Sequence, residues 1–273
     1  MKKFSGLEIG RIKKNLKSQN LFKKKYQYSI VSLNRNLKYL SKTFNLGSIA
    51  IIKTYAKNSK IIINDKEFDA NNHKYFTFGF KEIKLEANKK IIIGIAGIKS
   101  KIKINRIKSF KEKEVYKVKK PWGYELWING QVPTYSFKKI FIKKGNRTSL
   151  QFHKKKIETN FLFKGSAELT LSKKNGKFKK SQILKNIYKK KIYSGSFVNV
   201  KNYAVHRLKA ISDILLYEVS TPHLDDVIRL VDDKKRNLQN RKYCLQCSPF
   251  GEHNTKQIHR ISNTTKIKSE TSW

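Results

Sequence analysis

The sequence predicts an all-β protein that folds as a sandwich or a small barrel. Two observations carry this prediction: short strand-like runs recur along residues 48–236, and turn-forming residues separate them. This spacing favours antiparallel sheets over a parallel sheet with crossover helices. The longest apolar run, residues 91–98, has the length of a strand, so we expect that the chain does not span a membrane.

The first part of the chain divides into two segments. Residues 1–25 are rich in lysine and weakly patterned, which predicts a basic arm or a short first helix. Residues 26–110 are expected to form a β-rich N-terminal domain, with strands near 49–55, 60–63, 75–80, 82–85 and 91–98. A stretch rich in lysine and glutamate, residues 100–114, marks the expected boundary.

The second part also divides in two. Residues 115–236 are expected to form a β domain, with strands near 135–142, 149–153, 159–163, 167–171, 197–200 and 214–219. Residues 237–273 are polar and lack a periodic apolar pattern, which predicts a flexible tail.

The charge is strongly positive, with 62 basic residues against 19 acidic residues and a formal net charge of +43. Only nine of the basic residues are arginine, whereas phosphate and base recognition in nucleic acids relies on arginine. We therefore expect no nucleic-acid partner, but a field that attracts phosphorylated ligands. No apolar segment follows the basic N-terminus, so a secretory signal is not expected and a cytoplasmic location is predicted.

Four residues predict a metal site. Gln151 and His153 are two positions apart and face the same side of a strand, and Glu158 returns on the next strand after a turn. His206, beyond a further turn, supplies a fourth donor. Two imidazoles, one carboxylate and one amide oxygen suit Zn²⁺, which we expect, and are also compatible with Mn²⁺ or Fe²⁺.

The spacing around these residues resembles the first cupin motif, G-x5-H-x-H-x3-4-E-x6-G. Gly145, His153, Glu158 and Gly165 fit it, and Gln151 stands in place of the first histidine. The second cupin motif is matched by Gly195 and His206, while its proline, second glycine and asparagine are replaced. The resemblance implies a cupin double-stranded β-helix, or jelly-roll barrel, for residues 115–236. For residues 26–110, the β pattern alone suggests a degenerate second cupin.

Flanking motifs narrow the resemblance to type II mannose-6-phosphate isomerase domains. They are Lys120-Pro-Trp-Gly-Tyr-Glu125, Ser149-Leu-Gln-Phe-His153, His206-Arg-Leu208, Tyr217-Glu-Val219 and the closing run at 224–233. Such domains often follow a mannose-1-phosphate guanylyltransferase, but residues 1–110 lack the Gly-rich loop of that half. After His153 the chain also departs from the family, because lysines replace further histidines and Thr159-Asn160 replaces a His-Trp pair.

The resemblance implies a metal-dependent isomerase that interconverts a phosphorylated aldose and ketose, namely mannose 6-phosphate and fructose 6-phosphate, for polysaccharide or nucleotide-sugar precursors. The metal holds the carbonyl in such chemistry, while a side-chain base moves a proton between C1 and C2. Candidates for that base are Arg207, Glu218 and Lys138, although strand alternation turns Arg207 away from the side that His206 faces. The alternative is a non-catalytic sugar-binding cupin of a polysaccharide pathway. A homodimer is compatible with either function.

Three further features have two interpretations each. Trp122, in the Pro-Trp-Gly-Tyr segment, either closes one end of the barrel or contacts substrate. The pairs Asp225-Asp226 and Asp232-Asp233 are expected to cap a short helix rather than bind a second cation. Five lysines are expected to be solvated surface charges rather than phosphate ligands, namely Lys138, Lys139, Lys154, Lys155 and Lys156.

Overall fold

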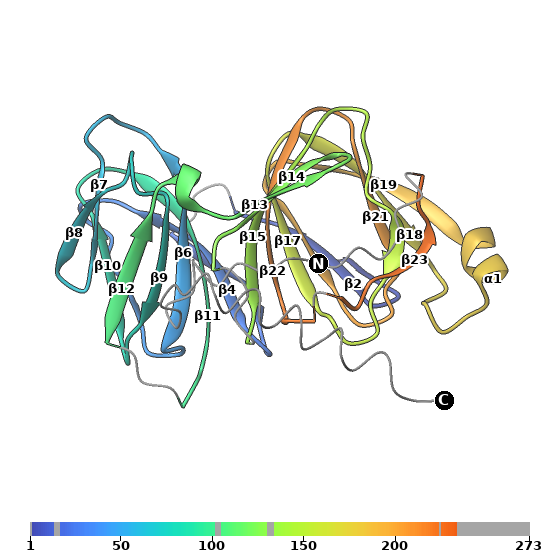
Figure 1. The fold of residues 1–273 in the computed structure, drawn as a ribbon, viewed down its shortest axis with the longest axis horizontal. Coiled ribbons are helices and arrows are strands. Elements are labelled where there is room, and N and C mark those ends of the chain that lie inside the picture. Colours follow the sequence, from blue (N-terminus) through green and yellow to red (C-terminus); the bar gives the residue numbers. More distant parts are fainter. Residues whose placement is uncertain (1, 14–16, 102–104, 130–133, 224, 234–273) are drawn as a thin grey trace, which may run out of the picture.

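A computed structural model of the chain describes residues 2–13, 17–101, 105–129, 134–223 and 225–233. These residues form two β-sandwiches that lie side by side (Figure 1). Nearly all of the regular structure is strand, and in these ranges no helix combines the length and the apolar character needed to cross a lipid bilayer. The predicted tail, residues 237–273, lies outside the described residues.

The N-terminal sandwich pairs a six-stranded sheet with a four-stranded sheet. The larger sheet has the order β12-β9-β6-β11-β4-β3 and the smaller sheet the order β5-β10-β7-β8. Its strands are β3 (Ser18–Lys23), β4 (Gln27–Leu33), β5 (Tyr39–Ser41), β6 (Leu46–Thr54), β7 (Lys60–Ile63), β8 (Lys66–Asp69), β9 (Tyr75–Gly79), β10 (Ile83–Ala87), β11 (Ile91–Ile98) and β12 (Arg106–Phe110).

The C-terminal sandwich pairs an eight-stranded sheet, β1-β2-β20-β17-β22-β15-β14-β13, with a five-stranded sheet, β19-β18-β21-β16-β23. The eight-stranded sheet contains β1 (Lys2–Phe4), β2 (Leu7–Arg11), β13 (Lys117–Lys120), β14 (Gly123–Trp127), β15 (Ser136–Ile142), β17 (Glu158–Lys164), β20 (Ser196–Val200) and β22 (Ile214–Ser220). The five-stranded sheet contains β16 (Leu150–Phe152), β18 (Ser166–Ser172), β19 (Ile187–Tyr193), β21 (His206–Ala210) and β23 (Ile228–Val231).

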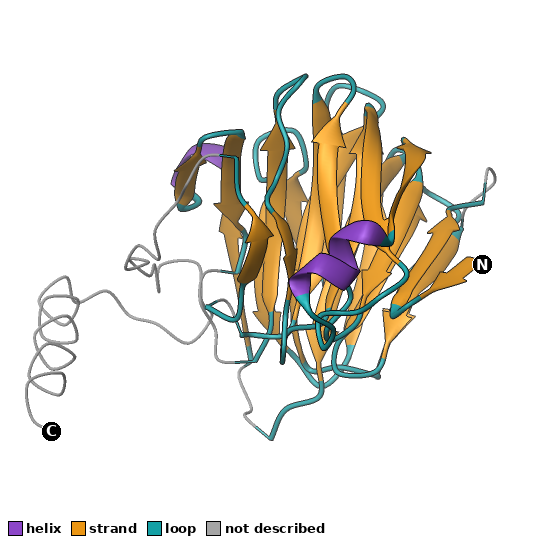
Figure 2. Ribbon diagram, turned by 90° about the vertical axis from the view of Figure 1, so that its right-hand side faces the viewer, coloured by secondary structure: helices purple, strands orange, loops and turns teal. Residues whose placement is uncertain are grey.

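Two helices complete the described part of the fold. The 3-10 helix η1 (Glu112–Glu114) joins the two sandwiches, and α1 (Lys180–Lys185) lies on the outer face of the five-stranded sheet (Figure 2). Ile183 of α1 is fully buried and packs against Leu150, Phe152 and Val205.

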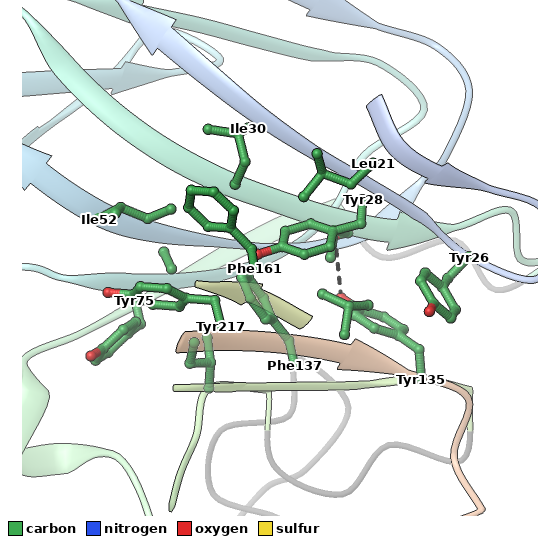
Figure 3. Close-up of a cluster of buried hydrophobic side chains, with 14 of the residues drawn as sticks. Leu21, Tyr26, Tyr28, Ile30, Ile52, Tyr75, Tyr135, Phe137, Phe161 and Tyr217 are labelled. Atoms are coloured by element: carbon green, nitrogen blue, oxygen red, sulfur yellow. Dashed lines mark hydrogen bonds between the residues drawn. The ribbon is translucent and has the colours of Figure 1, made fainter. Parts of the chain in front are cut away.

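The two sandwiches share a hydrophobic interface formed by their larger sheets. Tyr28 and Ile30 of β4 face Phe137 of β15 and Tyr217 of β22 across it (Figure 3). The hydroxyl groups of Ser48 and Tyr135 are 2.7 Å apart and hydrogen-bond across the same interface. Because successive side chains of a strand face opposite sides, the alternate residues of β15 and β22 remain available to line the interior of the C-terminal sandwich.

The interior of the N-terminal sandwich is apolar. Its core is made of side chains such as Ile49, Ile63, Phe76 and Leu85, all of them buried. Among the described residues, the one group of three or more histidine, cysteine, aspartate or glutamate side chains close enough to share a metal ion belongs to the C-terminal sandwich. The candidate metal site therefore lies in the C-terminal sandwich.

The N-terminal segment differs from the arm or short helix that the sequence predicted for residues 1–25. It contains β1, β2 and β3 instead, and β2 pairs with β20 of the C-terminal sandwich. Leu7 and Ile9 of β2 are buried, with 1% and 7% of their surface exposed, in the same core as Val198 and Val200. Lysine-rich composition concealed this strand, because two buried side chains at alternate positions are enough to hold a short strand against its neighbour β20.

Candidate metal centre

The strand pattern of the C-terminal sandwich brings distant residues to one interior position. Glu158 begins β17 and faces inward with Leu162, whereas Phe161 on the opposite face packs in the interface between the sandwiches. Gln151 of β16 lies directly opposite His206 of β21. His153 follows the end of β16, so one residue from each of three neighbouring segments reaches the interior.

His153, Glu158 and His206 converge. One ligand atom from each lies within 4.8 Å of the others, and all three residues are buried. Nε2 of His206 is 3.2 Å from Oε1 of Glu158, and Nε2 of His153 is 3.5 Å from Oε2 of the same carboxylate. The two imidazole rings have centroids 5.4 Å apart.

Backbone carbonyl groups orient both histidines. Nδ1 of His153 bonds to the carbonyl oxygen of Asp226, and Nδ1 of His206 lies 2.9 Å from the carbonyl oxygen of Ala204. A carbonyl oxygen only accepts hydrogen bonds, so each Nδ1 carries a proton and each ring turns its Nε2 toward Glu158. Metal-binding histidines are oriented in this manner.

The residues present fit a divalent metal ion. Nε2 of His153 is buried and finds no hydrogen-bond partner among the residues that the structure describes, which is the state expected of a ligand atom. Two neutral imidazoles and one carboxylate suit Zn²⁺, Mn²⁺ or Fe²⁺.

The electrostatic environment of His153 and Glu158 favours the protonation states in which these side chains bind a metal. Burial and the nearby charge of Lys156 lower the pKa of His153 to about 3, so its imidazole is neutral at physiological pH. Burial by itself would raise the pKa of Glu158, but Lys156 and the two histidines hold this pKa well below its usual value. Glu158 is therefore ionised.

Lys156 is a member of the site that sequence reasoning missed. It was expected to be a solvated surface charge, but 7% of its side chain is exposed. Its Nζ donates to Oε2 of Glu158 at 2.5 Å and to Oε1 of Glu218 at 2.9 Å. Burial would lower the pKa of Lys156, yet the two carboxylates raise it above its usual value. The available signal was its position two residues before Glu158, which puts both side chains on one side of an extended segment.

Asp226 holds the loop that carries Lys156. Its carboxylate accepts hydrogen bonds from the backbone N–H groups of Lys154, Lys155 and Lys156, with the outer two distances at 3.1 and 2.8 Å. Burial would raise the pKa of Asp226, but these three bonds lower it. Asp226 was expected to cap a short helix. It caps this loop instead, although it lies far from the loop in the sequence.

The three converging residues line a cavity of about 110 Å³ in the interior of the sandwich. Trp122 contributes to its wall, as do Ile140 and Leu216. The charged side chains of the wall are four cations, Lys120, Lys138, Lys156 and Arg229, and three carboxylates, Glu125, Glu158 and Glu218. The cations thus exceed the carboxylates by one even without a metal, which favours an anionic ligand.

Of the four remaining predicted site residues, Gln151, Glu218 and Lys138 line the cavity and Arg207 does not. Gln151 lines the cavity, but its Oε1 accepts a hydrogen bond from the hydroxyl of Ser149 at 2.6 Å. Glu218 and Lys138 lie opposite each other on β22 and β15 and also line the cavity. Lys138 is 3.5 Å from Oε2 of Glu125.

The structure does not bring Arg207 to the cavity. Its Nη2 bonds to the carbonyl oxygen of Val231 and to Asp233, both at 2.9 Å. Strand alternation turns Arg207 outward because His206 faces inward. Arg207 is therefore not placed to move a proton in the cavity.

Comparisons with known proteins show the fold. No family model and no curated protein matches the sequence. Among solved structures, the protein Ylba from E. coli is 9% identical, covering 82% of this chain and 94% of its own, with a TM-score of 0.58. An iolb-like protein from Salmonella typhimurium is 11% identical over 75% of this chain and 87% of its own, with a TM-score of 0.58.

Oxalate decarboxylase from Bacillus subtilis is also similar in structure. It is 9% identical, covering 83% of this chain and 78% of its own, with a TM-score of 0.54, and it was studied for its Mn(II) centres. These proteins have the cupin fold, so the predicted all-β cupin architecture of this chain is confirmed. At such low identity, the likeness shows the fold alone.

Proposed function

We propose that this chain is a metal-dependent sugar-phosphate isomerase that interconverts an aldose and a ketose, with mannose 6-phosphate and fructose 6-phosphate as the preferred pair. The observation that carries the proposal is the convergence of His153, Glu158 and His206 in a cavity whose wall is otherwise rich in cations. The resemblance of the flanking motifs to type II mannose-6-phosphate isomerases supplies the finer assignment.

His153, Glu158 and His206 would hold the divalent metal, and Gln151 could join them once its amide turns away from Ser149. A divalent metal bound there supplies Lewis acidity toward a substrate carbonyl and its neighbouring hydroxyl group. Zn²⁺ is the metal expected from the sequence, and the Mn(II) centres of oxalate decarboxylase, a structural neighbour, make Mn²⁺ an equal candidate.

The cavity size constrains how substrate binds. A volume of about 110 Å³ holds only the reacting end of a sugar phosphate, so the phosphate group would remain at the mouth. Lys120 and Arg229 are the more exposed cations of the wall, with 18% and 21% of their side chains accessible, against 5% for Lys138. We assign the phosphate to these two side chains, because a guanidinium and an ammonium group both bind phosphate oxygens.

Glu218 is the best placed of the candidate bases. Its carboxylate lines the cavity and accepts a hydrogen bond from Lys156, while Lys138 is engaged near Glu125 and over the ring of Trp127. In this role Glu218 would accept the proton from C2 of the aldose and return it to C1, while the proton of the C2 hydroxyl group passes to the oxygen on C1. Trp122, Ile140 and Leu216 form part of the apolar wall of the same cavity.

The test is a conversion assay on metal-loaded protein with hexose and pentose phosphates. We expect turnover of mannose 6-phosphate in the presence of Mn²⁺ or Zn²⁺. The Glu218→Gln variant should keep its metal and lose turnover by about 100-fold or more, the scale of a lost general base. Absence of turnover for every sugar phosphate by a protein that holds stoichiometric metal would contradict the proposal.

A non-catalytic sugar-binding cupin is the second candidate function. The observation that favours it is the ammonium group of Lys156 on Glu158, because a lysine in this position satisfies the carboxylate without any metal. This function predicts that sugar phosphates bind to metal-free protein and are not converted. Calorimetry on metal-free protein, paired with the conversion assay, separates the two functions.

A further inference from the structure

The ammonium group of Lys156 contacts the same carboxylate that His153 and His206 face. It donates to Oε2 of Glu158, the same oxygen that faces Nε2 of His153 at 3.5 Å. Its second acceptor, Oε1 of Glu218, lies on the neighbouring strand β22. Lys156 therefore joins two buried carboxylates that would otherwise repel each other.

A metal ion and this ammonium group cannot share the carboxylate without strong repulsion. A metal bound to Oε2 would lie about 2.1 Å from that oxygen, and Nζ of Lys156 lies 2.5 Å from it. The two positive charges would therefore be less than roughly 5 Å apart in a buried site, where repulsion is weakly screened.

Hydrogen bonds hold the backbone of the loop, so the side chain of Lys156 is the part that can move. The N–H groups of Lys154, Lys155 and Lys156 are fixed by the carboxylate of Asp226. The ammonium group can leave Glu158 and retain Glu218, because the lysine side chain has several rotatable bonds and two acceptors are present.

From this geometry we propose that Lys156 is a built-in competitor for the metal: its ammonium group holds Glu158 in the metal-free protein and must leave it when the metal binds. The affinity of the site for divalent metal is thereby set by a residue that is not a ligand. This inference rests on the proposed metal site, but it does not depend on which substrate is converted.

The test compares metal affinity in two lysine variants from the same loop. Lys156→Met removes the ammonium group, and Lys155→Met is the matched control, since Lys155 is exposed and does not line the cavity. Titration with Mn²⁺ by calorimetry should show Lys156→Met binding about 10- to 100-fold more tightly than the wild type, the range of one charge-assisted hydrogen bond, and Lys155→Met unchanged. Equal or weaker binding by Lys156→Met would overturn the proposal.

The outcome separates this inference from the proposed function. Tight binding by Lys156→Met together with no detectable binding by the wild type supports the competitor role and counts against a metal-dependent activity of the natural chain. If neither protein binds Mn²⁺, both proposals fail. If the wild type binds and converts sugar phosphate while Lys156→Met binds no more tightly, only the competitor role fails.

A measurement on the wild type covers the case in which Lys156→Met does not fold. Crystal structures of the wild-type protein with and without Mn²⁺ should differ in one contact. We expect Nζ of Lys156 within hydrogen-bond distance of Glu158 in the metal-free crystal and beyond that distance in the Mn²⁺-bound crystal. Retention of the contact beside a bound metal ion would overturn the proposal.

Discussion

The backbone carbonyl of Asp226 accepts the Nδ1–H of His153, and this bond fixes which nitrogen of the imidazole faces Glu158. The carboxylate of the same aspartate holds the loop that carries Lys156. One residue outside the ligand set thus positions a candidate ligand and the charge beside it. Its contribution can be measured separately from that of the ligands.

Replacing Asp226 with alanine should destabilise the protein and weaken metal binding. Three backbone N–H groups lose their acceptor, which is expected to lower the free energy of unfolding by about 1–3 kcal/mol. Because the loop also carries His153, affinity for Mn²⁺ should fall by about 10-fold, as for other residues that orient ligands. Urea unfolding and calorimetry measure the two effects. The control is Asp225→Ala, on an exposed neighbour, which should change stability by less than about 0.5 kcal/mol.

Stability of the metal-free protein should fall as the pH is lowered from about 6.5 to 4.5. The pKa of His153 is about 3 in the folded protein and 6.5 in its usual state, so in this range the unfolded chain binds a proton that the folded chain does not. This single group contributes a slope of up to about 1.4 kcal/mol per pH unit. Urea unfolding across the range checks the slope, and His153→Gln should reduce it. An unchanged slope in that variant would mean that His153 is not held neutral.

Strand β2 should be essential to the C-terminal sandwich, in contrast to a removable arm. Leu7 is 1% exposed in the core of that sandwich, so Leu7→Ala should cost about 2–5 kcal/mol of unfolding free energy. Leu40→Ala is the matched control, because Leu40 is 57% exposed and should change stability little. Equal effects of the two substitutions in urea unfolding would show that β2 does not pack as described.

The two sandwiches should unfold together because they share an apolar interface. Phe137 has no exposed surface there and contacts Tyr28, with ring centroids 5.7 Å apart. Phe137→Ala should cost about 3–5 kcal/mol, and the loss should appear in one cooperative transition observed by both calorimetry and circular dichroism. Tyr193→Ala, at a side chain 52% exposed, is the control. Two separate transitions in the wild-type protein would contradict a shared core.

Sequence reasoning recovered the features that depend on local periodicity. Alternation along a strand predicted that Arg207 faces outward, as the structure has it. The structure also brings His153, Glu158 and His206 together, while their role as metal ligands stays a prediction. Sequence reasoning failed where the outcome depends on distant partners. In the sequence, nothing distinguishes Lys156 from the other lysines of its loop, because its partner Glu218 lies on the distant strand β22. The role of Asp226 likewise depends on a loop more than sixty positions earlier in the chain.

The lysine-rich composition also made two features of the structure hard to predict. In a chain with 62 basic residues, one buried lysine does not stand out, and neither does a short strand such as β2 within a lysine-rich segment. Gln151 was predicted to be a metal ligand, and this stays a prediction, because a side-chain rotation rather than strand position decides whether its amide oxygen faces a metal or Ser149.

The central claim is that His153, Glu158 and His206 together hold a divalent metal, and a Mn²⁺ titration of two glutamate variants tests it most directly. Glu158→Gln removes the charge of the buried carboxylate, and Glu67→Gln does the same at a surface residue of the N-terminal sandwich whose side chain is 52% exposed. We predict one bound Mn²⁺ per chain for the wild type and Glu67→Gln, and an affinity at least about 10-fold lower for Glu158→Gln. Binding by Glu158→Gln as tight as that of the wild type would contradict the account.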